Sequence, residues 1–240
     1  MTLVLLTAAS LQVEATPLNW TDWTSVTQAS GVNPATATGT IDLNGSSIGV
    51  TLTSTSNFFV WHLGGGANPH GPVWSGSAYT NGDVDNAPVS EFIGFGLAGA
   101  VSVTFDQAVS GVYVAMNSWE NQSVNFGEAI TVDSSGPGNF GGTGVYTSYV
   151  NGEGFTTGGN PSGNWHGVVE LSGSRTGFSL THNTENWHGL TVRIASEVPA
   201  PATIGLFGIA LLALRVVGRR SSTPKNQLSS ACDCVGRIYL

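Results

Sequence analysis

Cysteine is absent from nearly the whole sequence. The only two, Cys232 and Cys234, lie near the C-terminal end, so no disulfide can link residues 16–197 to one another. A domain of that size can be stable through burial of apolar surface alone. A Cys-x-Cys pair can bind a soft metal ion, but no further ligands stand nearby, and we interpret the two residues as unpaired thiols.

Basic residues are also scarce. Between Thr16 and Glu197 the chain has 13 acidic residues and only two basic ones, Arg175 and Arg193, which gives a formal charge of −11. A surface this acidic repels nucleic acid and anionic lipid, and it can attract divalent cations. We therefore expect no nucleic-acid partner.

Residues typical of helices, above all Lys, Glu and Leu, are few, and no helical repeat precedes residue 198. Thr, Ser, Val and Gly dominate instead, and apolar residues alternate with polar ones in many short runs. The clearest runs are Val101–Phe105, Val112–Met116, Phe178–Thr181 and Leu190–Ile194, with others at Thr38–Leu43, Ser47–Thr53, Asn57–His62, Glu128–Asp133, Val145–Val150 and Val168–Ser172. The pattern predicts an all-β domain over residues 16–197, a jelly-roll-like antiparallel β-sandwich.

Glycine marks the expected connections. Asn-Gly pairs at residues 44–45, 81–82 and 151–152 favour tight turns. Three Gly-rich stretches, Gly64–Gly82, Gly136–Gly144 and Gly152–Gly163, predict long loops, where a sandwich would bind a ligand.

Two strings imitate catalytic motifs. Gly45–Gly49 has the Gly-x-Ser-x-Gly pattern of a nucleophile elbow, which requires a strand that enters a helix. Gly94–Gly99 has the dinucleotide-binding pattern, which requires a helix N-terminus for the pyrophosphate. The first string joins two expected strands, and we interpret it as a hairpin turn. The second is followed by residues that alternate like a strand, Ala100–Phe105, so no helix supplies the dipole that a pyrophosphate needs.

The one long apolar run lies close to the C-terminus and predicts a single hydrophobic helix. It extends from Ile204 to Leu214 and is short for a full membrane crossing unless its flanks are included. The positive-inside rule places its basic end in the cytoplasm and the preceding domain outside. A permanent membrane anchor and a buried helix of a soluble domain are the alternatives. The flanking residues are Val198, Pro199, Ala200 and Pro201 before the run and Arg215, Arg219 and Arg220 after it.

This order of parts, over residues 198–220, resembles the PEP-CTERM sorting domain of bacterial surface proteins, in which Pro-Glu-Pro takes the place of Pro199-Ala200-Pro201. The resemblance implies processing by an exosortase and export across the inner membrane, with transient anchoring before release to the cell surface or matrix. Residues 1–15 are expected to be a signal peptide, because residues 3–11 are mostly apolar and residues 13–15 suit cleavage. Residues 221–240 extend beyond the sorting pattern as an atypical tail.

A second, looser resemblance covers the domain itself. Its motifs are Asn19–Thr24, Ser135–Gly138 followed by Gly141-Gly142, and a closing strand that begins Trp-His-Gly. They are similar to motifs of uncharacterised PEP-CTERM proteins, which implies a surface or exopolysaccharide-associated role without a known active site.

Two motifs, Asn164–Gly167 and Asn186–Gly189, share the sequence Asn-Trp-His-Gly, and each is expected to precede a strand. We favour a structural role in which Trp fills the core and His bonds the backbone. A sugar-binding rim and a metal site closed by three histidines are the alternatives. The rim would comprise Trp61, Trp165, His166, Trp187 and His188.

The stretch Asn81–Asn86 places oxygen-bearing side chains at alternate positions. Calcium prefers six to eight oxygen ligands, so Asn81, Asp83 and Asp85 are candidate ligands of a structural calcium ion. The alternative is a solvated turn whose side chains bond their own backbone. No other cofactor is expected.

Three functions remain open. The first is a non-enzymatic, exported surface or matrix protein, and the second is a carbohydrate-binding module that uses Trp-rich loops. The third is a polysaccharide hydrolase, which would need two carboxylates in one cleft. The available carboxylates form no tight motif and are Glu120, Glu128, Glu153 and Glu170.

Overall fold

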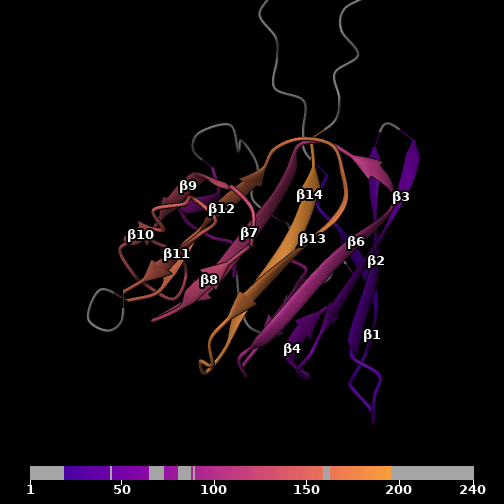
Figure 1. Ribbon diagram of the computed structural model, residues 1–240, viewed down its shortest axis with the longest axis horizontal. Coiled ribbons are helices and arrows are strands. Elements are labelled where there is room, and N and C mark those ends of the chain that lie inside the picture. The colour runs from indigo at the N-terminus through magenta and orange to yellow at the C-terminus, as the bar shows by residue number, and fades with distance from the viewer. Residues whose placement is uncertain are drawn as a thin grey trace, which may run out of the picture. The chain divides into compact units, whose positions relative to one another are not determined.

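Two antiparallel sheets make up the structure, a computed structural model that describes residues 19–43, 45–64, 73–80, 88, 90–158 and 163–195 (Figure 1). Within those ranges the only helical element is a short 3-10 turn, η1 (Ser77–Tyr79). The all-β class expected from the alternating pattern is confirmed.

The large sheet has eight strands, and Figure 1 shows β1, β2 and β3 at one end of it and β8, β10 and β11 at the other. In spatial order its strands are β1 (Asp22–Thr27), β2 (Ala35–Leu43), β3 (Ser46–Ser54), β6 (Gly99–Val109), β13 (Arg175–His182), β8 (Ser123–Asn125), β11 (Gly154–Thr157) and β10 (Tyr146–Ser148).

The small sheet has six strands, and most of its central positions are buried. In spatial order they are β4 (Phe58–His62), β5 (Phe92–Phe95), β14 (His188–Ile194), β7 (Val112–Trp119), β12 (Trp165–Leu171) and β9 (Thr131–Gly136).

The main core lies between the two sheets. Alternate residues of β6 and β13 point into it, namely Val101, Val103 and Phe105 and then Phe178 and Leu180, and β14 supplies Leu190 and Val192 from the small sheet. These side chains are the apolar members of the alternating runs, and their burial drives the sheets together. The structure is therefore sandwich-like, as the alternation predicted.

The small sheet is also covered on its outer face. Val73, Trp74 and Tyr79, from the segment that contains η1, pack there against Ala115 and Val168. This second cluster explains why β7 and β12 are buried on both faces.

Both catalytic-looking strings lead into strands and neither opens a helix, as expected. Gly45 has a φ of 86° and lies in the hairpin turn between β2 and β3, where Leu43 pairs with Ser46. In the second string Gly94 belongs to β5, and the chain enters β6 at Gly99 with no helix between them. The turn at residues 151–152 joins β10 to β11, with Gly152 at a φ of 73°.

Two expectations were wrong in detail. Neither Trp-His motif precedes its strand, because β12 begins at Trp165 and β14 begins at His188. The stretch Gly152–Gly163 is not all loop, because β11 occupies Gly154–Thr157 and pairs with β8.

Several predictions fall outside the described residues. They concern the signal peptide at residues 1–15, the sorting motif at residues 198–201, the hydrophobic helix with Arg215, Arg219 and Arg220, the tail at residues 221–240, and the candidate calcium ligands Asn81, Asp83 and Asp85. Among the residues that the structure does describe, no helix has the length and hydrophobicity needed to cross a membrane.

Candidate functional site

The two Asn-Trp-His-Gly motifs present their Trp and His side chains to opposite faces of the small sheet. Trp165 lies in the main core, with its ring centroid 4.6 Å from that of Phe155, whereas His166 lies on the outer face beside Tyr79. In the second motif His188 packs in the main core and Trp187 joins the outer cluster. The two copies are therefore not structurally equivalent.

The reason is the register of the two strands on β7. Gly167 of β12 pairs with Met116, whereas Gly189 of β14 pairs with Asn117, one residue further along. A shift of one residue moves every side chain of a strand to the other face. An irregularity between Trp165 and Gly167 accommodates the difference.

Of the expected ligand rim, only Trp61 and Trp187 have exposed surface. Trp61 is 38% exposed on β4, and Trp187 is half-buried with its ring centroid 5.0 Å from that of Phe140. The other three members, Trp165, His166 and His188, are fully buried.

A cleft of about 710 Å³ opens elsewhere, where the start of the described chain passes from one sheet to the other. Trp20 and Thr21 extend the small sheet beside β14, where Trp20 pairs with Arg193 and the Thr21 amide donates to the Val192 carbonyl at 2.9 Å. From Asp22 onward the chain belongs to β1 of the large sheet. This crossing leaves a gap between β1–β3 and the residues that lead into β5.

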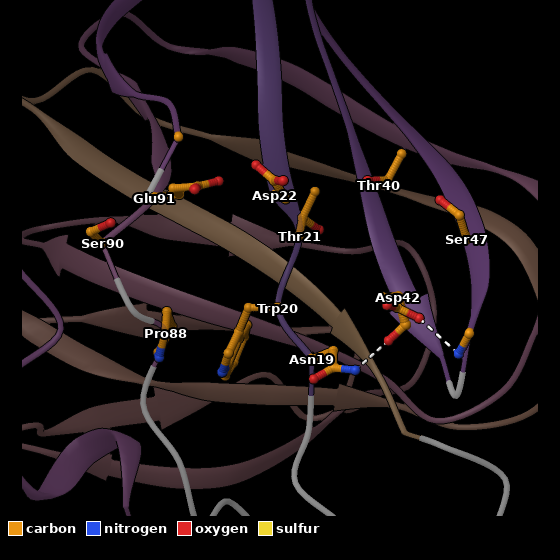
Figure 2. Close-up of a pocket in the computed structure, with 12 residues that line it drawn as sticks. Asn19, Trp20, Thr21, Asp22, Thr40, Asp42, Ser47, Pro88, Ser90 and Glu91 are labelled. Carbon is orange, nitrogen blue, oxygen red and sulfur yellow. Dashed lines mark hydrogen bonds between the residues drawn. The ribbon is translucent and has the colours of Figure 1, made fainter. Parts of the chain in front are cut away.

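Polar side chains and one indole line the cleft (Figure 2). Trp20 stands between Asn19 and Pro88, and the carboxylates of Asp22 and Glu91 face one another on one side of it. The lining also includes Asp42, whose Oδ1 accepts a hydrogen bond from the amide of Gly45, and the hydroxyl groups of Thr40, Ser47 and Ser90.

Glu91 is held in place by the crossing. Its Oε2 accepts a hydrogen bond of 2.5 Å from the backbone amide of Trp23, the first fully buried side chain of β1. Burial raises the pKa of Glu91, and the negative charge of Asp22 raises it further, while the Trp23 amide opposes the shift.

Arg193 lies behind Trp20. Its side chain is fully buried, with the guanidinium carbon 5.1 Å from the Trp20 ring centroid and 4.3 Å from that of Tyr113. Arg193 therefore supports the indole from inside the sheet and does not line the cleft.

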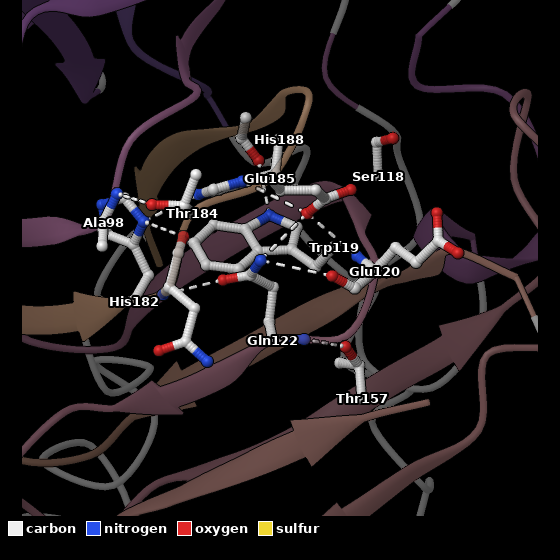
Figure 3. Close-up of polar contacts among 12 residues, drawn as sticks. Ala98, Ser118, Trp119, Glu120, Gln122, Thr157, His182, Thr184, Glu185 and His188 are labelled. Atoms are coloured by element: carbon white, nitrogen blue, oxygen red, sulfur yellow. Dashed lines mark hydrogen bonds and ion pairs between the residues drawn. The ribbon is translucent and has the colours of Figure 1, made fainter. Parts of the chain in front are cut away.

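A second polar cluster is buried within the sandwich (Figure 3). His188 Nε2 lies 2.8 Å from His182 Nδ1, and His188 Nδ1 lies 3.3 Å from Glu185 Oε2. The Glu185 carboxylate also accepts hydrogen bonds from the Glu120 amide at 3.0 Å and the Gln122 side-chain amide at 3.2 Å. We call these five residues the Glu185 network.

The indole of Trp119 packs against the Glu185 network. The Trp119 ring centroid lies 4.3 Å from that of His188, and its indole N–H donates to the Gly189 carbonyl at 2.9 Å. Burial raises the pKa of Glu185 to about 8 and lowers that of His188 to about 2. The pKa of His182 is lowered for the same reason, so burial removes charge from all three groups.

Paired titratable groups of this kind occur in catalytic sites, but neither the Glu185 network nor Trp119 lines the cleft. Within the described ranges, no three His, Cys, Asp or Glu side chains are grouped so as to hold a metal ion. The carboxylates considered for hydrolysis are dispersed: Glu128, for example, pairs with Arg175 at 2.6 Å.

Comparison of the chain with models of known protein families, with curated proteins and with solved structures found no match.

Sequence reasoning missed both the cleft and the Glu185 network. The cleft combines segments near residues 20, 42 and 90, which no local pattern connects. Glu185 stands two residues before Trp187, but nothing in that spacing indicates that its carboxylate turns back toward Glu120.

Proposed function

We propose that this protein is an exported, non-enzymatic cell-surface or extracellular-matrix protein. The observation that carries the proposal is the order of parts from Val198 to Arg220, namely a Pro-x-Pro motif, an apolar run and a group of arginines. The acidic sandwich, which has no disulfide-forming cysteine over residues 16–197, is the exported domain.

The expected finer features belong to this proposal. They are a PEP-CTERM-like signal cut by an exosortase, a signal peptide at the other end, and a jelly-roll arrangement of strands. The last is supported by the chain path from β6 to β9 and from β12 to β14, in which successive strands alternate between the two sheets.

Mass spectrometry of the released protein tests this proposal. We expect full-length chain produced in a bacterium with an exosortase to yield a secreted form that ends near Pro199. Replacement of Arg219 and Arg220 by Gln should leave the chain unprocessed in the membrane fraction. Released protein that still contains residues 204–240 would contradict the proposal.

Carbohydrate binding is the second candidate, favoured by one observation in particular. The cleft places the half-buried Trp20 among side chains that form hydrogen bonds, the combination that a sugar ring needs for stacking and for its hydroxyl groups. Trp61 and Trp187 are the other aromatic candidates with exposed surface.

Polysaccharide pull-down with matched variants tests which of these three tryptophans contacts the sugar. If the cleft is the site, Trp20→Phe should weaken retention while Trp61→Ala and Trp187→Ala leave it unchanged. The reverse result would place the binding site at the rim that was predicted from the sequence. Circular dichroism of each variant controls for unfolding.

A polysaccharide hydrolase is the third candidate. Asp22 and Glu91 share one cleft, and the raised pKa of Glu91 suits a general acid. New reducing ends from a polysaccharide, lost in Glu91→Gln, would favour this candidate over the non-enzymatic one.

A further inference from the structure

The charge of the cleft limits what can bind there. Three of its lining side chains are carboxylates, Asp22, Asp42 and Glu91, and none of its described lining residues is basic. Sugar acids, sulfated sugars and phosphates would therefore meet like charge among these side chains, and the Arg193 guanidinium is fully buried behind the Trp20 ring. The surrounding domain adds to this, since its formal charge is −11 between Thr16 and Glu197.

The aromatic member of the lining adds a second requirement. Trp20 presents a flat apolar surface beside hydroxyl, amide and carboxylate groups, so a suitable ligand has both an apolar face and several hydroxyl groups. An indole also attracts a cation placed over its ring. A bare metal ion would use neither property.

A protonated amine satisfies the carboxylates better than a neutral sugar does. Asp22 and Glu91 face one another, and the charge of Asp22 contributes to the raised pKa of Glu91. A positive group between them would relieve this repulsion, whereas a neutral sugar would leave it unchanged.

We propose that the cleft beside Trp20 binds a saccharide that carries free amino groups, with the sugar face against the indole and an ammonium group between Asp22 and Glu91. The inference rests on the carbohydrate-binding candidate above and names its ligand class. Hydroxyl groups of the same sugar would be bonded by Asn19 and Ser47, which also line the cleft.

The test is calorimetric titration of the full chain with two oligosaccharides of equal length, a glucosamine hexamer and its fully N-acetylated form. They share the same sugar ring and linkage and differ in the charge of the amine. We expect the glucosamine hexamer to bind at least about tenfold more tightly, which is the effect of one well-placed charge pair.

Three variants test whether the hexamer binds in the cleft. Asp22→Asn should weaken binding of the glucosamine hexamer about tenfold, and Trp20→Phe should also weaken it. Asp106→Asn removes the same charge from an exposed position of β6 that does not line the cleft, and it should change affinity less than about twofold.

Each other outcome overturns the inference in a distinct way. Equal binding of the two hexamers would refute the amine requirement and leave the carbohydrate-binding candidate standing. Equal losses of affinity in Asp22→Asn and Asp106→Asn would show that the overall negative charge attracts the hexamer and that the cleft is not its binding site. Binding of neither hexamer would refute the amino-sugar site, and pull-down with neutral polysaccharides would then decide the broader candidate.

Discussion

Replacement of Glu185 by Gln should change how stability depends on pH. The side chain of Glu185 is 11% exposed, and burial raises its pKa from 4.5 to about 8. A carboxyl group with a raised pKa in the folded state supports folding below pH 4.5, and this support is lost as pH rises through about 8, because the unfolded chain ionises freely.

The expected size follows from the shift. A change of pKa from 4.5 to about 8 corresponds to about 5 kcal/mol, and partial access of water to the carboxylate reduces this to about 2–3 kcal/mol. Gln can still accept the hydrogen bond from the Glu120 amide, but it cannot ionise. We therefore compare the free energy of unfolding of Glu185→Gln with that of the unaltered protein. The difference should be about 2–3 kcal/mol more in favour of the variant at pH 8.5 than at pH 5.

Urea unfolding at the two pH values, followed by tryptophan fluorescence, measures this gain. Asp106→Asn is the matched control, since it removes a carboxylate from an exposed position outside the Glu185 network. If the difference between Glu185→Gln and the unaltered protein is the same at pH 5 and pH 8.5, the carboxylate is not held neutral and the argument is refuted.

Three further predictions concern stability and are measured by urea unfolding. Because burial lowers the pKa of His188 from 6.5 to about 2, its contribution is lost as pH falls below 6.5, and His188→Gln should remove about 2 kcal/mol of the loss expected at pH 5. If the variant and the unaltered protein lose the same free energy of unfolding at pH 5, this prediction is contradicted. Trp119→Phe should cost about 2–3 kcal/mol, since it leaves a buried carbonyl without its indole donor; a cost under about 0.5 kcal/mol would show that the bond is dispensable. Gly142→Ala should cost at least about 3 kcal/mol, because the added carbon would lie 1.8 Å from a backbone oxygen, whereas Gly141→Ala, with a similar positive φ and open space, should cost about 1 kcal/mol. Equal costs would mean that the contact relaxes.

The sequence predicted best those strands that have one buried face. In β6 and β13 apolar residues occur at every second position over Val101–Phe105 and Phe178–Leu180, and burial follows the same period. Strand β14 shows the same alternation in sequence, although all seven of its residues are buried. Strand β5 was missed because all four of its residues are buried, so no alternation marks it. Strand β1 was missed for the opposite reason, since Trp23 is its only buried residue.

The candidate sites were less predictable, because they depend on register and on contacts between distant segments. Identical letters in the two Trp-His motifs suggested equivalent roles, but their offset on β7 gives Trp165 and Trp187 different surroundings. Trp20 showed no feature that distinguished it as a ligand residue. Its position follows from pairing with Arg193, which lies 173 residues further along the chain.

That pairing places the first and the last described segments side by side. A short linker could therefore join the chain near Asn19 to the chain near Ala195, and new ends could be opened at Gly173, a turn between β12 and β13 with a φ of 83° and open space around it. Such a circularly permuted domain would keep every strand pairing in both sheets. It would also allow a fluorescent reporter or a second domain to be attached at this turn without interrupting a strand.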